Sequence, residues 1–511
     1  MLSKGRAREG QNIFGSNSMT GIAITLFVKN PDSPIHGKVY YHDIGNDLTK
    51  NEKLELIERF GSMFGISESG EWQAINPDQH GDWISQRDDN FSKFIAIGDK
   101  KGADQKLFEN YSGGVMTARD AWCFNYSRAA AASNMQKMIA FYNSELQRFN
   151  HVYAGLDKKI RESALNSFIN TNPELISWTV NLKNDLLRDR KFAFKPQCLV
   201  PSLYRPFTKQ WLYFDRTFNE RVLQLPRIFP SPSAENLVIC VSGVGARSGF
   251  SALMTSVIPT YDTLEKSQCF PLYLFDENQQ ENCDDMFAAK SGNAPLRRDA
   301  ITDQGLSQFQ QAYPGEQVRK EDLFYYVYGI LHSADYRERF VDNLSKELPR
   351  IPVLKNASDF WAFCQAGRDL AELHLNYETV EPYPLRIETN GKLNDADYRV
   401  EKMKFKKSKD PVTGKNVNDL SAVIYNSRIT LAEIPLSAWD YVVGGKAALD
   451  WVMERQRVKT DKPSGIVQDA NGWAIETMDN PRYPLELFQR VVTVSLKTQE
   501  IIKSLPKLDI L

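Results

Sequence analysis

Residues 204–229, YRPFTKQWLYFDRTFNERVLQLPRIF, alternate basic side chains with aromatic ones. Cationic side chains in such a mixture hold phosphates, while aromatic rings pack beside sugars and bases. A solvated basic face on an ordinary strand pair gives the same pattern, so both interpretations stand at this point. The stretch supplies five basic candidates for nucleic-acid contact: Arg205, Lys209, Arg216, Arg221 and Arg227.

A second basic stretch, YRVEKMKFKKSK at residues 398–409, places Lys402, Lys404, Lys406 and Lys407 on one arm of a predicted hairpin. Such an arm could follow a phosphate backbone or enter a groove. Lysines also guard exposed edge strands against pairing with other chains, and that interpretation explains the pattern equally well.

A third candidate lies in a glycine-rich stretch, GVGARSGFSALMTSVIPTYDTLEKSQ, at residues 243–268. It sets Arg247, Ser248 and Lys266 among residues that favour loops. Flexible backbone there would let Arg247 reach a base edge, whereas the alternative is a plain surface loop.

Catalytic motifs are missing from the sequence. It contains no GxxxxGK[ST] phosphate loop, no GxGxxG opening a helix, no HExxH and no GxSxG. Residues 480–483, Asn-Pro-Arg-Tyr, are superficially similar to the Asn-Pro-Pro-Tyr loop of adenine methyltransferases, but they lack the second proline and predict a turn. His332 and His374 are expected to be core residues, and the scattered cysteines to be free thiols, so no catalytic and no metal-binding residue is predicted.

The overall charge excludes a global electrostatic signature of nucleic-acid binding, because 63 Lys and Arg face 64 Asp and Glu for a net charge of −1. Local patches remain possible. A length of 511 residues predicts two to four domains. No apolar run long enough to span a membrane and no signal-peptide core is found, so we expect a cytoplasmic protein without a membrane partner.

Hydrophobic patterns predict a mixed α+β fold. Two apolar runs, 22–28 and 38–44, are joined by turn residues and predict a β-hairpin, which needs neighbouring strands to be stable. The stretch 276–318 is polar and is expected to be an exposed insertion. Helices are predicted at 51–61, 128–149, 157–169 and 174–190, short strands over 191–275, further helices over 321–352 and 357–378, a hairpin over 398–435 and helices after 437. The helix at 128–149 carries one apolar stripe that is expected to pack in the core, formed by Met135, Met138, Ile139, Tyr142, Leu146 and Phe149.

Long segments of the chain resemble a known family. QRDDNFSKFIAIGDKK, YSGGVMTARDAWCFNYS, LYRPFTKQWLYFD, VIPTYDTLEKSQCFPLYLF, FWAFCQAGRDLAELHLNYE and LAEIPLSAWDYVVGGKAALDWVMERQRVKTDKPSG occur in the order found in the C-terminal specificity region of type ISP restriction-modification enzymes. The match runs from about residue 65 to the C-terminus. The hairpin before it resembles the last strands of the adenine-N6 methyltransferase domain.

The resemblance implies four segments: an incomplete methyltransferase end (1–64), a mainly helical connection (65–190), a mixed strand and helix DNA target-recognition region (191–436) and a C-terminal helical segment (437–511). It implies recognition of double-stranded DNA, with adenine methylation and restriction carried out by methyltransferase, translocase and nuclease modules in cis or in trans. Those modules would use S-adenosylmethionine, ATP and Mg, and this chain itself would bind no cofactor.

Three functions therefore compete. The chain is a DNA-binding specificity module without activity of its own, one subunit of a split DNA adenine methyltransferase, or a degenerate fragment acting as an interaction scaffold. The orphan hairpin favours the last of these, the interaction scaffold, because strands without their sheet expose edges that associate with other chains.

Overall fold

The computed structural model describes residues 12–13, 22–34, 36–100, 102, 105–276, 296–409 and 414–511. Contacts divide the chain into a first unit, Met1–Lys93 with Arg339–Glu347, and a second unit, Phe94–Glu338 with Leu348–Leu511. The predicted mixed α+β class is confirmed. Domain boundaries at 64, 190 and 436 stay predictions.

The first unit is small and leaves much apolar surface uncovered. The expected hairpin is not formed in its described residues: 22–30 carry no strand, and Phe27 and Val28 are 90% and 86% exposed. Instead β1 (Val39–Tyr41) pairs antiparallel with β2 (Gln73–Ile75). The predicted helix at 51–61 is confirmed as α2 (Lys50–Phe60), which Thr49 and Glu52 cap reciprocally. Neither α2 nor α3 (Met63–Glu68) buries a residue.

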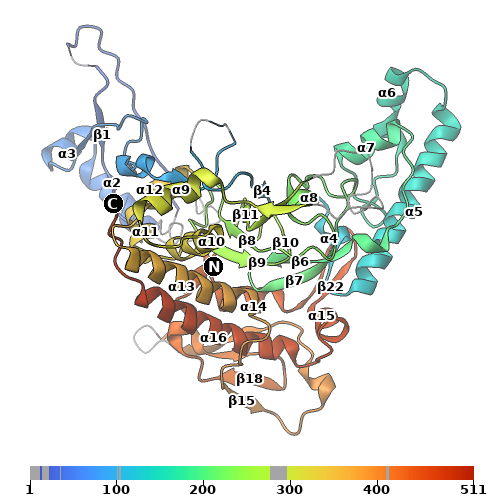
Figure 1. Ribbon diagram of the computed structural model, residues 1–511. Helices are drawn as coiled ribbons and strands as arrows, with labels where there is room; N and C mark the ends of the chain where they lie inside the picture. Colours follow the sequence, from blue (N-terminus) through green and yellow to red (C-terminus); the bar gives the residue numbers. More distant parts are fainter. Residues whose placement is uncertain are drawn as a thin grey trace. The chain divides into compact units, whose positions relative to one another are not determined.

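Two four-stranded sheets form the centre of the second unit (Figure 1). Their strands are short, as predicted for 191–275, and the strands β8 and β9 are buried along their whole length. Buried apolar strands of this kind supply core rather than a wet face. One sheet has the order β10-β6-β7-β5 (Ile258–Pro259, Leu199–Arg205, Thr208–Tyr213, Phe124–Asn125), and the other has the order β4-β11-β8-β9 (Ser112–Gly113, Gln268–Pro271, Val238–Val241, Ala252–Thr255).

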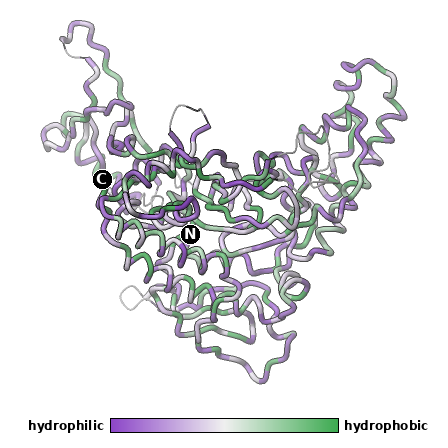
Figure 2. Tube along the Cα trace, in the orientation of Figure 1, coloured by the Kyte–Doolittle hydropathy of each residue, from purple (hydrophilic) through white to green (hydrophobic). Residues whose placement is uncertain are grey.

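A helical segment lies between β5 and β6 in sequence. α5 (Arg128–Tyr153) buries the predicted stripe, which consists of Met135, Met138, Ile139, Tyr142, Leu146 and Phe149. α6 (Lys158–Phe168) follows, and hydrophobic and hydrophilic residues alternate along both helices (Figure 2). The helix predicted from 174 begins only at α7 (Val180–Leu187), because the Thr179 side chain accepts the Leu182 N–H and caps the helix there.

The C-terminal third adds a layer of helices and a third sheet. α10 (Lys320–Ile330) packs on α13 (Ala357–Leu375), which packs on α16 (Tyr483–Ser504). The predicted hairpin over 398–435 is confirmed within a sheet of order β15-β18-β17-β16 (Arg386–Thr389, Ile429–Ala432, Asn416–Ile424, Lys404–Lys409). The predicted turn at 480–483 precedes α16, where the Tyr483 N–H donates to the Asn480 carbonyl.

The polar stretch 276–318 differs from its prediction. Residues 277–295 lie outside the described residues, but β13 (Arg297–Asp299) pairs with β12 (Tyr273–Phe275). α9 (Asp303–Ala312) then buries Phe309 completely. Phe309 is one buried aromatic side chain within a mostly polar stretch, so the composition of the stretch did not reveal that the helix packs against the core.

The remaining elements are short. They are β3 (Ile95–Ala96), α4 (Asp120–Cys123), α8 (Leu225–Ile228), α11 (Ala334–Arg339), α12 (Val341–Lys346), β14 (Arg350–Ile351), β19 (Val442–Val443), β20 (Lys446–Ala447), α14 (Ala448–Arg455), β21 (Val458–Thr460), β22 (Val467–Asp469) and α15 (Ala470–Glu476). No helix in the described part of the chain is long and apolar enough to cross a membrane.

His332 and His374 are core residues, as predicted, with 1% and 2% exposure. The Tyr328 hydroxyl lies 2.6 Å from His374 Nδ1 and accepts the Met254 N–H at 3.0 Å. Thr498 Oγ1 lies 3.0 Å from His374 Nε2. Burial, with the nearby Arg337 charge, lowers the pKa of His374 to about 3. Burial also lowers the pKa of His332 well below its usual range. Both imidazoles are therefore neutral in the folded chain.

Replacing Gly367 by alanine should destabilise the chain. A Cβ on Gly367 would lie 1.9 Å from the Tyr325 carbonyl oxygen across the α10 and α13 contact. Gly→Ala in an exposed helix stabilises by about 1 kcal/mol, whereas this clash should cost about 1–3 kcal/mol. Urea unfolding measures the difference, with Gln365→Ala on the exposed face of α13 as the control. A Gly367→Ala chain as stable as wild type would show that the helices can move apart freely.

Acid should destabilise the fold through the buried histidines. The unfolded chain takes up a proton on each imidazole below about pH 6.5, whereas folded His374, with a pKa of about 3, does not. The contribution of the neutral imidazole to the free energy of unfolding is therefore complete above about pH 6.5 and is lost as the pH drops toward 3. In His374→Gln the slope of unfolding free energy between pH 6 and 4 should shrink by up to about 1.4 kcal/mol per pH unit. Parallel curves for wild type and variant would contradict a neutral buried His374.

Candidate nucleic-acid interface

Several loops of the second unit pack together beside the first central sheet, and we call them the loop platform: residues 113–118, 204–208, 215–223, 243–250, 260–267 and 442–446. Backbone pairing joins them in a row. Ile258 pairs with Ser202 of β6, Val115 with Thr260, and Met116 with Arg221. The Gly444 N–H donates to Ser251 Oγ at 3.0 Å and ties the 442–446 turn to the 243–250 loop. Segments distant in sequence thus share one surface.

The loop platform holds strained backbone. Five of the nine described non-glycine residues with positive φ lie in it: Ala118, Phe207, Leu223, Glu265 and Lys266. Each such residue costs of order 1–3 kcal/mol and persists only where its surroundings fix it. Phe207 shows how this is done, because its positive φ completes the two-residue turn between β6 and β7 while its ring is buried. Strain concentrated in connecting loops marks a candidate functional site.

Two of the predicted contact residues are instead engaged inside the fold. Arg205 donates from Nη1 to the Tyr204 carbonyl at 2.6 Å, and its Nη2 lies 3.7 Å from Asp262. Lys209 Nζ lies 2.7 Å from Glu378, which also accepts the Tyr483 hydroxyl at 2.6 Å. These basic side chains hold β6 and β7 in place, and the sequence pattern alone did not distinguish that role from DNA contact.

Arg227 belongs to an ion-pair network of its own. Its Nη2 lies 3.4 Å from Asp276 Oδ1, which also accepts Arg298 Nε at 3.0 Å. Arg298 pairs in turn with Glu109. The hydrogen bond from Arg298 lowers the pKa of Asp276, so the carboxylate stays ionised and Arg227 is neutralised.

Arg216 and Arg221 are exposed on the 215–223 loop of the platform. Arg221 pairs through its backbone with Met116, in both directions at 2.9 Å, which fixes its position while its side chain meets solvent. In the described part of the chain neither side chain has an ion pair. Both guanidinium groups can therefore meet a phosphate without breaking an existing contact.

The fold brings together Arg247, Ser248 and Lys266, the three candidates of the third stretch, around Glu265. The Glu265 carboxylate accepts the Ser248 N–H at 2.9 Å and Arg247 Nε at 3.4 Å. Lys266 Nζ does not reach out but donates to the carbonyls of Val244 and Gly245, at 3.3 and 3.0 Å. Arg247 itself remains 79% exposed. Sequence reasoning missed Glu265, because its partners lie 17 and 18 residues earlier.

The lysine hairpin, β16 with β17, lies on the third sheet. The side chains of Lys402, Lys404, Lys406 and Lys407 are exposed, and Lys407 donates to Asn418. The partly buried Phe405 contacts Trp439, with ring centroids 5.1 Å apart, and anchors the arm. The register shifts between Phe405 and Lys406, which is the irregularity that discourages edge pairing. The hairpin therefore fits both interpretations given above.

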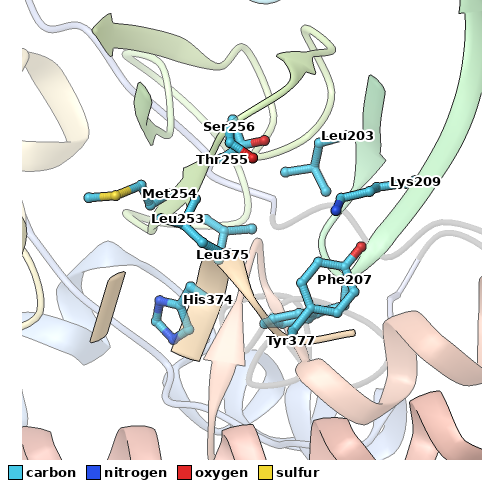
Figure 3. A pocket seen from close by; sticks show the side chains of 10 residues that line it. All are labelled: Leu203, Phe207, Lys209, Leu253, Met254, Thr255, Ser256, His374, Leu375 and Tyr377. Atoms are coloured by element: carbon cyan, nitrogen blue, oxygen red, sulfur yellow. The ribbon is translucent and has the colours of Figure 1, made fainter. Parts of the chain in front are cut away.

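A small pocket opens between the β6–β7 turn, β9 and the end of α13 (Figure 3). Its polar lining includes Lys209, Thr255, Ser256 and His374. Its volume of about 10 Å³ holds about one water molecule and is too small for a nucleobase. The residues described here include no group of three or more His, Cys, Asp or Glu that could hold a metal ion. Five described cysteines are free and buried, and Cys283 lies outside the described residues.

Comparisons with a family model and with solved structures show which known proteins this chain resembles. The family model of the Type ISP C-terminal specificity domain matches residues 106–487. A nuclease-deletion mutant of the Type ISP restriction-modification enzyme LlaGI, solved with a DNA substrate mimic, is 35% identical with a TM-score of 0.81. DNA-bound Type ISP LlaBIII is 34% identical with a TM-score of 0.80, and DrdV in a DNA complex is 30% identical with a TM-score of 0.78.

These matches cover 100%, 100% and 99% of this chain, but only 43%, 30% and 46% of LlaGI, LlaBIII and DrdV. The search of curated proteins gave no match. The resemblance seen in the sequence is confirmed by both the family model and the structures. The chain therefore belongs to the Type ISP family, and residues 106–487 match its C-terminal specificity domain.

Proposed function

We propose that the chain recognises a specific double-stranded DNA sequence for a Type ISP restriction-modification system. The observation that carries this proposal is the strained loop platform with its exposed arginines. It lies in a chain similar over its full length to Type ISP enzymes solved with DNA. Phosphate contacts would supply affinity, and a few side chains in the major groove would supply sequence specificity.

The charge distribution supports a small set of DNA contacts. Net charge is −1, and Arg205, Lys209 and Arg227 are already paired with carboxylates. The cations left to bind phosphates are those of Arg216, Arg221 and the lysine hairpin. Arg247 is left to contact a base. A neutral chain with a local basic surface binds DNA in an orientation set by that surface, since long-range attraction is weak.

Methylation of adenine and cleavage of DNA would be carried out by methyltransferase, translocase and nuclease modules of the same system. Those modules would use S-adenosylmethionine, ATP and Mg in the cytoplasm, and this chain would bind none of them. The exposed apolar run at 22–28 supports such a partnership, because an extended segment with unpaired backbone can add a strand to another sheet. The same run favours the second candidate function, a subunit of a split DNA adenine methyltransferase.

Selection from random duplex DNA tests the proposal. The 511-residue chain should enrich a short asymmetric motif at two salt concentrations, with affinity falling steeply as salt rises because counterions are released. Sequencing of the bound pool identifies the motif. Binding without enrichment would mean that the reading surface needs the methyltransferase sheet, and no binding to any duplex would leave the scaffold interpretation.

The lysine hairpin should contribute affinity without sequence preference. Replacing Lys402, Lys404, Lys406 and Lys407 together by alanine should lower affinity for every duplex. It should also reduce the slope of log affinity against log salt by about 0.9 for each phosphate that the hairpin no longer neutralises. The control removes the same charge elsewhere, from the exposed Lys355, Lys497, Lys503 and Lys507. Equal slopes for the hairpin variant and wild type would remove the hairpin from the interface.

A further inference from the structure

We propose that Arg247 reads a guanine in the major groove with its two Nη amino groups, and that Glu265 is the positioning residue that aims it. This assignment rests on the proposed function and names the part of the loop platform that confers specificity. Neither residue carries a buried ion pair of the core, and their contact joins two loops that the fold brings together.

The guanidinium of Arg247 is held at one end only. Its Nε donates to Glu265 Oε1 at 3.4 Å, while the side chain stays 79% exposed. Within the described ranges its Nη groups have no partner. The two Nη groups form the planar fork that matches the O6 and N7 acceptors of guanine. A fork fixed at Nε loses less rotamer entropy on binding than a free side chain.

Contacts with Glu265 and Lys266 fix the loop that carries Arg247. The Gly243 N–H donates to the Glu265 carbonyl at 3.1 Å, and Lys266 Nζ donates to the carbonyls of Val244 and Gly245. A Cβ on Gly243 would lie 2.4 Å from the Lys266 carbonyl oxygen, so the two loops touch through their backbones. The glycine-rich sequence indicates flexibility, but these contacts give the loop one arrangement.

Glu265 remains ionised in this setting. Burial raises its pKa, but hydrogen bonds from the backbone N–H groups of Ser248 and Arg247, and from their side chains, outweigh burial and lower the pKa overall. Its positive φ of 52° aims the carboxylate under the 243–250 loop, and such strain is kept where geometry matters. The Glu265 side chain is only 26% exposed, whereas Arg247 is 79% exposed, so Arg247 is the more accessible partner of the pair.

The ion pair favours a base over a phosphate as the partner of Arg247. Charge on Arg247 is offset by the carboxylate 3.4 Å away, which weakens attraction to an anion. Guanine O6 and N7 are neutral acceptors and need a directed fork rather than net charge. Arg216 and Arg221 lack a carboxylate partner among the described residues and suit phosphates instead. The loop platform therefore contains one arginine suited to a base, Arg247, and two arginines suited to phosphates, Arg216 and Arg221.

Duplex selection with wild type, Arg247→Ala, Glu265→Gln and the double variant Arg216→Ala with Arg221→Ala tests the assignment. Wild type should select a motif containing at least one G·C pair. Arg247→Ala should lose preference at one such position, with affinity for the best site down about 5- to 150-fold and affinity for unrelated DNA within about two-fold. Glu265→Gln should weaken preference at that same position. The double variant should weaken all sequences alike.

Three results would overturn the assignment. Arg247→Ala could select the same base as wild type at every position, or it could weaken all sequences equally, as a phosphate contact does. A wild-type motif without any G·C pair would also exclude it. Failure of wild type to select any motif is a different result, because it overturns the proposed function and the assignment falls with it. Matching thermal unfolding of all variants shows that each one is folded.

Discussion

Backbone-to-backbone contact between loops is the constraint on which the candidate site depends. A Cβ on Gly114 would lie 2.2 Å from the Thr260 carbonyl oxygen, and one on Gly445 would lie 2.8 Å from Ser248 Cβ. Only glycine permits such approach, because any side chain would push the loops apart. These contacts bring segments from four parts of the chain into one platform. The positive φ angles of Glu265 and Lys266 follow from the same closeness, since the turn they form must fit beneath Gly243.

Charge pairing then decides which basic residues remain available. Buried or half-buried cations need partners, because desolvation of an unpaired charge costs far more than a surface ion pair returns. Arg205 and Lys209 pair with Asp262 and Glu378, and so are parts of the scaffold. The exposed cations on the platform loops include Arg216, Arg221 and Arg247, in a chain whose charge is close to neutral. The proposed DNA recognition would therefore depend on where the exposed cations lie and not on total charge.

Structural features that depend on local periodicity could be predicted from the sequence. The apolar stripe of α5 and the capped helix α2 were predicted because their signals lie within a few residues. The prediction that the 22–28 run forms a paired strand was wrong. Strand formation depends on a partner strand, and the local sequence pattern does not identify that partner. The anchor Phe309 was hidden in polar composition. In the site, Arg247, Ser248 and Lys266 were named as candidates on one stretch, but Glu265 was not, since only the fold brings it beside Arg247.

The residues that fix the backbone of the platform are separate from Arg247, the proposed reading residue, and that separation has a consequence for the proposed specificity. Close-packed glycines and the paired cations fix the backbone, so their replacement would disturb the fold. Val244 and Arg247 are exposed at the end of the loop and take little part in the core. Surface substitutions of this kind usually change stability by no more than about 0.5 kcal/mol. The same scaffold can therefore carry different side chains at its loop ends, and with them different target sequences, without loss of the fold.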